Sequence, residues 1–203
     1  MLIKFYERDN RQSDIDRVVK ILEEGGLAVL PTDGYYALCC NAMKTKAVEN
    51  VCRLKGINPE KNRLSLICYD LSTISNYTQL DDARFKVLKR HLPGPFTFIL
   101  PGTHKLPKIF WGRKEVGIRM PENKIVVSLA KALGVPLLAA SLPIDEGGDE
   151  GYFVNPELIN EALGERVDVI VDGGMGRAMV TTVVDLTSDE WQVIRQGEGE
   201  FEK

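Results

Sequence analysis

A short apolar run near the start of this chain ends directly in residues that could bind a ligand. Residues 27–30 are apolar and read as a short buried strand, and Pro31 ends it because proline has no N–H for a sheet ladder. Thr32, Asp33 and Gly34 follow at once, and ligands of open α/β sheets sit at such strand ends. The same residue types also form ordinary turns. From this stretch alone, an ordinary turn and a ligand-binding loop are equally good interpretations.

Hydroxyl and guanidinium groups recur on, or directly after, other expected strands. These groups suit phosphate oxygens, because both donate hydrogen bonds and the guanidinium adds charge. The residues concerned are Thr97, Arg119, Ser141, Thr181, Thr182 and Arg195. Each also has an ordinary interpretation: Arg119 as an ion-pair residue, Ser141 as a cap or turn residue, and Thr182 as a strand-filling side chain. Together they predict an anion site, provided that the fold brings them together.

The charge distribution favours an anionic ligand. The 203 residues carry a net charge of −3, yet residues 44–124 hold 16 Lys and Arg against 7 Asp and Glu, and the remainder holds 10 against 22. A basic middle segment favours a nucleotide or a nucleic-acid backbone. The alternative is a set of solvated helix faces, which the helical spacing of Arg84, Lys86, Lys89 and Arg90 fits.

Composition also removes several classes of protein. The cysteines show no CxxC spacing and the chain has only two histidines, so neither a zinc site, a disulfide framework nor a His-based triad is predicted. No apolar run approaches the ~18 residues of a membrane helix, and the N-terminus has no signal-peptide pattern. We therefore expect a cytoplasmic protein with reduced cysteines, no resident metal and no membrane partner. The cysteines are Cys39, Cys40, Cys52 and Cys68.

Helices and strands that alternate must position these residues. Helices are expected at 14–24, with Ser13 as its cap, and from a cap at Thr45 to the stop at Gly56. Further helices are expected at 81–92, with Phe85, Val87 and Leu88 facing inward, at 124–133, and from Asn155 or Pro156 to about residue 163. Strands are expected at 27–30, 64–68, 96–100, 116–120, 135–140, 168–171, 181–186 and 193–194. Strands crowd toward the end, which predicts a mixed α/β sheet with helices packed on it. Polar loop 57–63 carries Lys61 and Arg63, and acidic, Gly-rich loop 142–151 is expected to be mobile.

Six sequence pieces stand in an order that resembles the YrdC/YciO family. They are LPTDGYYALCCNA, LKG, LPGPFTFIL, VGIRMP, TTVVDL and IRQGEG. The resemblance covers about residues 14–199 and is strongest to the YciO branch. It implies one YrdC-like domain over residues 1–203, with a twisted mixed α/β sheet of the YrdC/RibB kind. It also implies flanking helices and a large concave, electropositive face.

The resemblance implies an activity and an alternative to it. The enzymatic branch of the family is a nucleotidyltransferase that forms L-threonylcarbamoyladenylate from ATP, L-threonine and bicarbonate, for tRNA threonylcarbamoylation, with Mg²⁺ expected alongside ATP. The family is also associated with double-stranded RNA. The alternative is a non-catalytic RNA-binding protein acting in translation or ribosome biology. Phe110 and Trp111, within basic loop 104–115, fit base stacking or a plug on the core.

Residue roles follow from the same resemblance. It implies two catalytic residues, Lys55 facing the ATP phosphates and Arg119 meeting the threonine carboxylate. Thr32 would contact threonine and Thr97 the nucleotide. Ser141, Thr181 or Thr182, and Arg195 would line the nucleotide pocket. Asp33, Lys61 and Arg63 are further candidate binding residues from their places in the sequence, outside the residues that the resemblance implies.

Two departures from the enzymatic branch concern the phosphate end. Its Lys-x-Arg signature is here Lys55-Gly56-Ile57, and its Ser-x-Asn signature is Ser141-Leu142-Pro143. Ile57 holds no charge, and losing one preorganised donor of this kind costs ~10²–10³ in rate. Lys61 or Arg63 would have to supply the missing cation.

Overall fold

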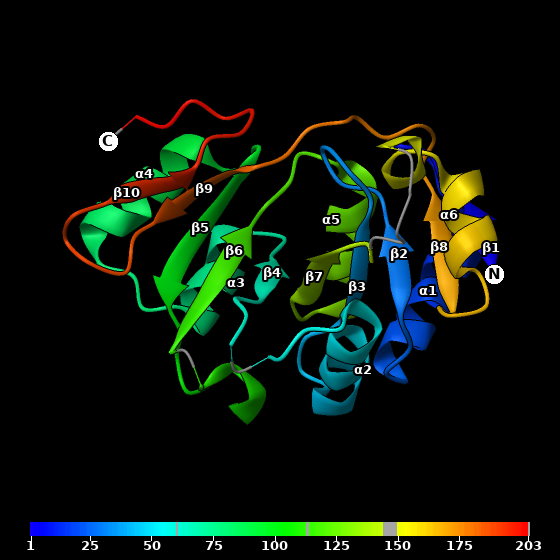
Figure 1. Cartoon of the computed structure of the whole chain (residues 1–203), viewed down its shortest axis with the longest axis horizontal. Helices are drawn as coiled ribbons and strands as arrows, with labels where there is room; N and C mark the ends of the chain where they lie inside the picture. The colour runs from blue at the N-terminus through cyan, green and yellow to red at the C-terminus, as the bar shows by residue number, and fades with distance from the viewer. Residues whose placement is uncertain (60, 113, 144–149, 203) are drawn as a thin grey trace.

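The structure is a computed structural model, and it describes residues 1–59, 61–112, 114–143 and 150–202. Over these residues the chain forms one ten-stranded sheet in the order β1-β8-β2-β3-β7-β4-β6-β5-β9-β10, with helices on both faces (Figure 1). The two ends of the chain lie at opposite ends of the sheet. None of the helices described is long and apolar enough to cross a membrane.

The strands and helices have the following bounds. The strands are β1 (Leu2–Lys4), β2 (Ala28–Leu30), β3 (Ala37–Asn41), β4 (Ser65–Ile67), β5 (Phe96–Pro101), β6 (Glu115–Arg119), β7 (Leu137–Ser141), β8 (Val169–Asp172), β9 (Thr182–Asp185) and β10 (Gln192–Arg195). The α-helices are α1 (Gln12–Glu23), α2 (Thr45–Lys55), α3 (Leu71–Tyr77), α4 (Asp82–His91), α5 (Lys124–Leu133) and α6 (Pro156–Leu163). Two 3-10 turns, η1 (Lys108–Phe110) and η2 (Glu150–Phe153), complete the set.

The sheet is mixed, which confirms the predicted fold class. Strand β8 pairs in parallel with β1 and β2, and the pairs β4·β6 and β5·β9 are also parallel. The pairs β2·β3, β3·β7, β4·β7, β5·β6 and β9·β10 are antiparallel. A sheet of this kind must be covered where its strands are apolar on both faces.

Helices cover the two faces of the sheet unequally. On one face, buried residues of α2, α3, α4 and α6 pack on a core that spans strands from β2 to β9. On the other face, α1 and α5 pack on residues of β8, β2, β3 and β7 together with Ile67 of β4. That second core stops there, so the same face of β6, β5 and β9 has none of these helices packed against it. The uncovered part of the sheet is where a ligand can approach.

Helix ends follow the chemistry read from the sequence in several places. Gly56 ends α2 with φ 66° and Gly134 ends α5 with φ 75°, a left-handed conformation that glycine adopts without strain. Asn155 caps α6 through a hydrogen bond from the Glu157 amide, as expected. The four cysteines are all buried and none of them forms a disulfide, so their place in the core is as predicted.

Other expectations about the elements are wrong. Ser13 and Thr45 lie inside the first turns of α1 and α2, and neither helix has a side-chain cap. Phe85, expected to face inward on α4, is 38% exposed. Ser141 ends β7 instead of opening the next loop. Most of loop 142–151, whose mobility was expected, lies at residues 144–149, outside the described residues.

Three elements were missed altogether: β1, β3 and α3. Strand β3 is buried along its whole length, so it shows no alternation of apolar and polar residues. Helix α3 has seven residues, LSTISNY, which include no strong helical stripe. Strand β1 has three residues and lies at the edge of the sheet.

Candidate functional site

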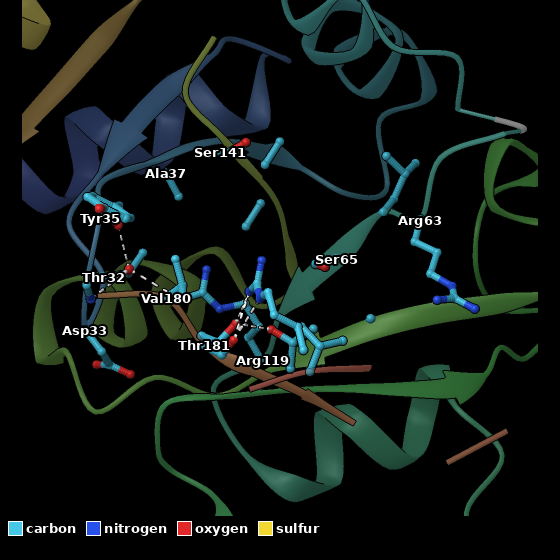
Figure 2. Close-up of a pocket in the computed structure, with 18 of the residues that line it drawn as sticks. Thr32, Asp33, Tyr35, Ala37, Arg63, Ser65, Arg119, Ser141, Val180 and Thr181 are labelled. Atoms are coloured by element: carbon cyan, nitrogen blue, oxygen red, sulfur yellow. Dashed lines mark hydrogen bonds between the residues drawn. The ribbon is translucent and has the colours of Figure 1, made fainter. Parts of the chain in front are cut away.

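A cavity of about 530 Å³ opens on the uncovered part of the sheet (Figure 2). Nine of the eleven predicted site residues line it, although they come from positions 32 to 195 of the chain. They are Thr32, Asp33, Lys55, Arg63, Thr97, Arg119, Ser141, Thr181 and Arg195. The convergence required for a single anion site is therefore present in the structure, while the role of each residue stays a prediction.

The floor of the cavity is made of small side chains on neighbouring strands. Gly117 of β6 lies opposite Ser65 of β4 and Ile99 of β5 in the sheet register. A Cβ atom at Gly117 would come within 2.6 Å of Ser65 Oγ and 3.3 Å of Thr97 Cγ2. Glycine at this position therefore leaves room that any larger residue would fill, and it keeps the floor open to a ligand.

One end of the cavity is built on the loop after β2. The Thr32 hydroxyl donates to the Tyr35 carbonyl at 2.7 Å, and Arg119 Nη2 donates to Thr32 Oγ1 at 3.3 Å. Figure 2 shows Thr32 and Tyr35 on this side and Arg119 nearer the middle. Thr32 is buried and Arg119 is half-buried at the end of β6. A guanidinium beside a hydroxyl is a suitable partner for a carboxylate or a phosphate.

Lys55 occupies another side of the cavity. Its Nζ atom donates to Ser141 Oγ at 2.7 Å and to the Leu142 carbonyl at 3.1 Å. Both acceptors are neutral, and burial lowers the pKa of Lys55 from its ordinary value. The end of α2 thus brings an ammonium group against the end of β7, where an arriving anion would add the charge that the present partners lack.

Another wall of the cavity is centred on Thr181, the residue directly before β9, which is hydrogen-bonded to residues of β5 and β10. The Thr97 and Thr181 hydroxyls share a hydrogen bond of 2.8 Å. The Arg195 guanidinium donates to the Thr181 carbonyl at 2.9 Å and to its Oγ1 at 3.1 Å. Neutral partners on this wall therefore hold the exposed guanidinium of Arg195 at the cavity.

Arg119 and Asp33 modify one another's charge. Burial lowers the pKa of Arg119, and the Arg195 charge acts in the same direction, while Asp33 and Cys39 oppose it. Arg119 remains a cation, because a guanidinium is too basic to lose its proton in a protein. Burial raises the pKa of Asp33, against the opposing effects of the Asn123 amide and Arg119. Of the residues that the structure describes, four basic side chains and one acidic side chain line the cavity, a balance that favours anionic ligands.

Two predicted residues do not face the cavity. Thr182 is fully buried; its hydroxyl donates to the Gly199 carbonyl at 2.6 Å and accepts from the Gly197 amide at 2.9 Å. Alternate strand residues point to opposite faces, so Thr181 and Val183 face the cavity and Thr182 does not. Of the two alternatives, Thr181 or Thr182, the one that lines the cavity is Thr181, and its binding role stays a prediction. Lys61 is exposed and lies outside the cavity lining.

Arg63 lines the cavity but is already paired. Its Nε lies 2.8 Å from Glu115 Oε1 and its Nη2 lies 3.6 Å from Asp185 Oδ2. Figure 2 shows the side chain directed away from Arg119 and Ser141. In this conformation Arg63 does not supply the cation that the enzymatic signature has at the position of Ile57, and Ile57 itself lines the cavity.

The aromatic pair of loop 104–115 separates into two environments. Phe110 is buried, as expected for a plug on the core, whereas Trp111 is 46% exposed and donates from Nε1 to the Leu106 carbonyl at 2.8 Å. Neither residue lines the cavity. A contact of this pair with RNA would therefore occur outside the cavity.

Sequence reasoning missed one wall of the cavity. Met179 and Val180, together with Tyr35, line it beside Thr32. Met179 belongs to the connection from β8 to β9, which runs across the top of Figure 1. Its carbonyl would lie 2.2 Å from a Cβ atom at Gly34. Met179 and Val180 are apolar, so neither was a candidate ligand residue, and the nearest signal was the threonine pair that follows them.

The described residues contain no group of three or more His, Cys, Asp or Glu side chains able to hold a metal ion. Asp33 supplies the one carboxylate in the cavity lining.

The comparisons agree with the geometry. Residues 20–197 match the sequence model of the Sua5/YciO/YrdC family, whose description reads "telomere recombination". YciO of Escherichia coli, described as uncharacterized, is 40% identical to this chain over 195 residues, which cover 95% of this chain and 93% of YciO. The crystal structure of E. coli YciO superimposes on this structure with a TM-score of 0.89. That superposition has 37% sequence identity and covers 98% of this chain and 97% of the YciO chain.

Two more distant relatives carry functional names. A threonylcarbamoyl-AMP synthase of Vibrio vulnificus is 28% identical, covering 91% of this chain and 99% of its own. Sua5 of P. abyssi, crystallised with L-threonine, shares the fold with a TM-score of 0.85 at 24% identity, over 97% of this chain and 57% of that one. By the extent of the family match and the likeness to YciO, this chain is a member of the Sua5/YciO/YrdC family.

Proposed function

We propose that this protein binds ATP and L-threonine in the cavity and, with bicarbonate, forms L-threonylcarbamoyladenylate, the nucleotide intermediate of tRNA threonylcarbamoylation. The observation that carries the proposal is the convergence of Thr32, Lys55, Arg119, Ser141 and Arg195 on one cavity. A relative named as such a synthase and a Sua5 structure with L-threonine support it.

The chemistry asks the protein for position and charge more than for a base. Threonine and bicarbonate condense to a carbamate with loss of water; a carbamate oxygen then attacks the α-phosphorus, and the bond to the leaving pyrophosphate breaks. Arg119 and Thr32 would hold the threonine end, and Lys55 with Ser141 would face the phosphates. Thr97, Thr181 and Arg195 would line the nucleotide. Fixed donors at developing negative charge are the main source of such rate enhancement.

The proposal also specifies the metal ion, the cell compartment and the relative rate of the reaction. Mg²⁺ would be carried by the oxygens of the triphosphate, because the described residues offer no metal cluster. The cytoplasm is the proposed compartment, as it supplies ATP and tRNA. Because Ile57 leaves the phosphate end one cation short, we expect a slower reaction than in members that keep the Lys-x-Arg signature.

Pyrophosphate release tests the proposal. Purified protein with Mg²⁺ and ATP should release pyrophosphate only when both L-threonine and bicarbonate are added, and omission of either should return the signal to the blank. Mass spectrometry of the mixture should detect the adenylate. Equal release without threonine, or none at enzyme concentrations of several micromolar, would contradict the proposal.

A second candidate function rests on a separate surface. Lys105, Lys108 and Lys114 are exposed around half-exposed Trp111, outside the cavity. Such a cluster favours the alternative of double-stranded RNA binding through phosphate contacts. The two functions separate cleanly, because variants of these lysines leave every cavity residue in place.

A further inference from the structure

Asn123, which lies outside the cavity lining, makes hydrogen bonds to both residues that open the cavity. Its side-chain Nδ2 donates to the Thr32 carbonyl at 3.3 Å, and its backbone amide donates to Asp33 Oδ1 at 2.9 Å. Its side-chain oxygen accepts from the Ile125 amide at 3.1 Å and the Val126 amide at 3.2 Å, and so caps α5. One residue therefore joins the loop after β2 to the start of a helix.

The same short segment holds Thr32 from two directions. Arg119, at the end of β6, reaches the Thr32 hydroxyl, and Asn123, four positions later, reaches the Thr32 carbonyl. The hydroxyl is engaged further, since it donates to the Tyr35 carbonyl. Fixing the carbonyl of Thr32 fixes its Cα, and with it the direction in which the hydroxyl meets the Arg119 guanidinium.

Helix α5 provides a rigid support for this arrangement. Five of its ten residues are buried, and they pack with α1 on the sheet. A loop tied to such an element keeps its geometry when the cavity is empty, which lowers the ordering cost of binding.

We propose that Asn123 is a positioning residue that clamps the Thr32–Asp33 loop to α5, so that Thr32 and Arg119 form a preorganised end of the cavity. This proposal rests on the proposed function for the identity of the ligand, L-threonine. Its structural content, the clamp on the loop, does not depend on that ligand.

Three variants separate the clamp from the cap. Asn123→Ser keeps a hydroxyl oxygen for capping α5 and removes the donor to Thr32. Asn123→Ala removes both. Asp70→Ala is the matched control, because Asp70 caps α3 by accepting from the Thr73 amide, and α3 packs on the other face of the sheet.

Hydrogen–deuterium exchange tests the clamp without a ligand. In Asn123→Ser we expect amides of residues 32–36 to exchange about 2- to 10-fold faster, the effect of losing one neutral hydrogen bond, while amides within α5 keep the wild-type rate. Asn123→Ala should accelerate both regions. Asp70→Ala should accelerate α3 alone. Unchanged exchange at residues 32–36 in both Asn123 variants would overturn the proposal.

Kinetics supply the functional half of the test. Asn123→Ser should raise KM for L-threonine about 2- to 10-fold and leave kcat within twofold of wild type. The reason is that the Thr32–Asp33 loop, no longer fixed in advance, must become ordered when L-threonine binds. A loss in kcat alone would contradict a role in positioning the threonine end. If wild-type protein releases no pyrophosphate, the proposed function fails, and the exchange experiment still decides the clamp.

Discussion

Lys55 is a cation at the cavity whose observed hydrogen-bond acceptors carry no charge, so a bound anion would stabilise it. It is half-buried at the end of α2, and its acceptors, Ser141 Oγ and the Leu142 carbonyl, are both neutral. It stands directly before Gly56 and Ile57, where the resemblance to the enzymatic branch implies a second cation at the position of Ile57. The sequence identified the residue, but its contact with Ser141, 86 positions away, is a product of the fold.

Replacement of Lys55 measures that contribution. Lys55→Ala should lower threonine-dependent pyrophosphate release by ~10²–10³, the cost of one preorganised donor at developing charge. Lys46→Ala, an exposed lysine on the same helix and outside the cavity, is the control and should retain wild-type activity. Retention of activity within twofold by Lys55→Ala would remove Lys55 from the site.

Asp33 makes a prediction about pH. Burial raises the pKa of Asp33, so the folded protein binds a proton on this carboxyl more tightly than the unfolded chain does. At pH values above the ordinary pKa of aspartate, the ionised carboxylate therefore lowers the stability of the fold. Asp33→Asn keeps an acceptor for Asn123. Its free energy of unfolding at pH 7 should therefore equal or exceed that of wild type, and the difference should shrink as pH falls toward 4.

Asp70 is the control of opposite sign. Hydrogen bonds from Thr73 lower the pKa of Asp70, so its contribution is present above the ordinary pKa and is lost on acidification. Asp70→Asn should therefore be less stable than wild type at pH 7. Urea unfolding at several pH values measures both variants, and a destabilised Asp33→Asn at pH 7 would contradict the account.

At the scale of elements, the sequence predicted the ends of helices where a single residue type marks a helix end. Gly134 marked the end of α5 and Asn155 the start of α6, and both are as predicted. Strand β3 and the connection from β8 to β9 carry no such signal, because their conformation is set by burial and by long-range contacts. The cavity residues could be named in advance, but Asn123 could not be recognised as a clamp, since its role exists only in contact with Thr32.

Gly34 tests the packing of the β8–β9 connection. In Gly34→Ala the new Cβ atom would lie 2.2 Å from the Met179 carbonyl, so this connection must move outward. We expect a loss of about 1–3 kcal/mol in stability, typical of overpacking, and weaker ligand binding, because Met179 and Val180 line the cavity.

A milder glycine substitution is the control. At Gly102 an added Cβ atom would lie 3.1 Å from Leu106 Cδ1, the end of a flexible side chain. Gly102→Ala should therefore cost less than Gly34→Ala in urea unfolding and leave ligand binding unchanged. Equal effects of the two substitutions would contradict the close packing of Met179 on Gly34.

At the scale of the whole molecule, unequal helix cover is what creates the site. The hydrophobic core formed with α2, α3, α4 and α6 extends over most of one face of the sheet. The core formed with α1 and α5 on the other face ends at Ile67 of β4, so neither of these helices covers β6, β5 and β9 on that face. The order of the strands brings segments distant in sequence to this opening. The order of the expected strands and helices predicted a mixed sheet. The order of the strands within the sheet depends on pairings such as β5·β9, which link residues 86 positions apart and leave no local signal.

RNA binding is a property of the surface as a whole and has its own test. Binding to duplex RNA through phosphates should weaken steeply between 50 and 200 mM salt (concentrations at which such contacts are typically compared). Lys108→Ala should weaken it and reduce the salt slope by about one, with pyrophosphate release unchanged. Binding that is absent, or that ignores salt, would remove this second candidate.

A crystal structure with Mg²⁺, ATP and L-threonine tests the central claim most directly. The account predicts the nucleotide in the cavity, with its phosphates near Lys55 and Ser141 and its remaining part along Thr181 and Arg195, and the threonine carboxylate on Arg119. An empty cavity at saturating ligand, or a nucleotide bound on another surface, would contradict it.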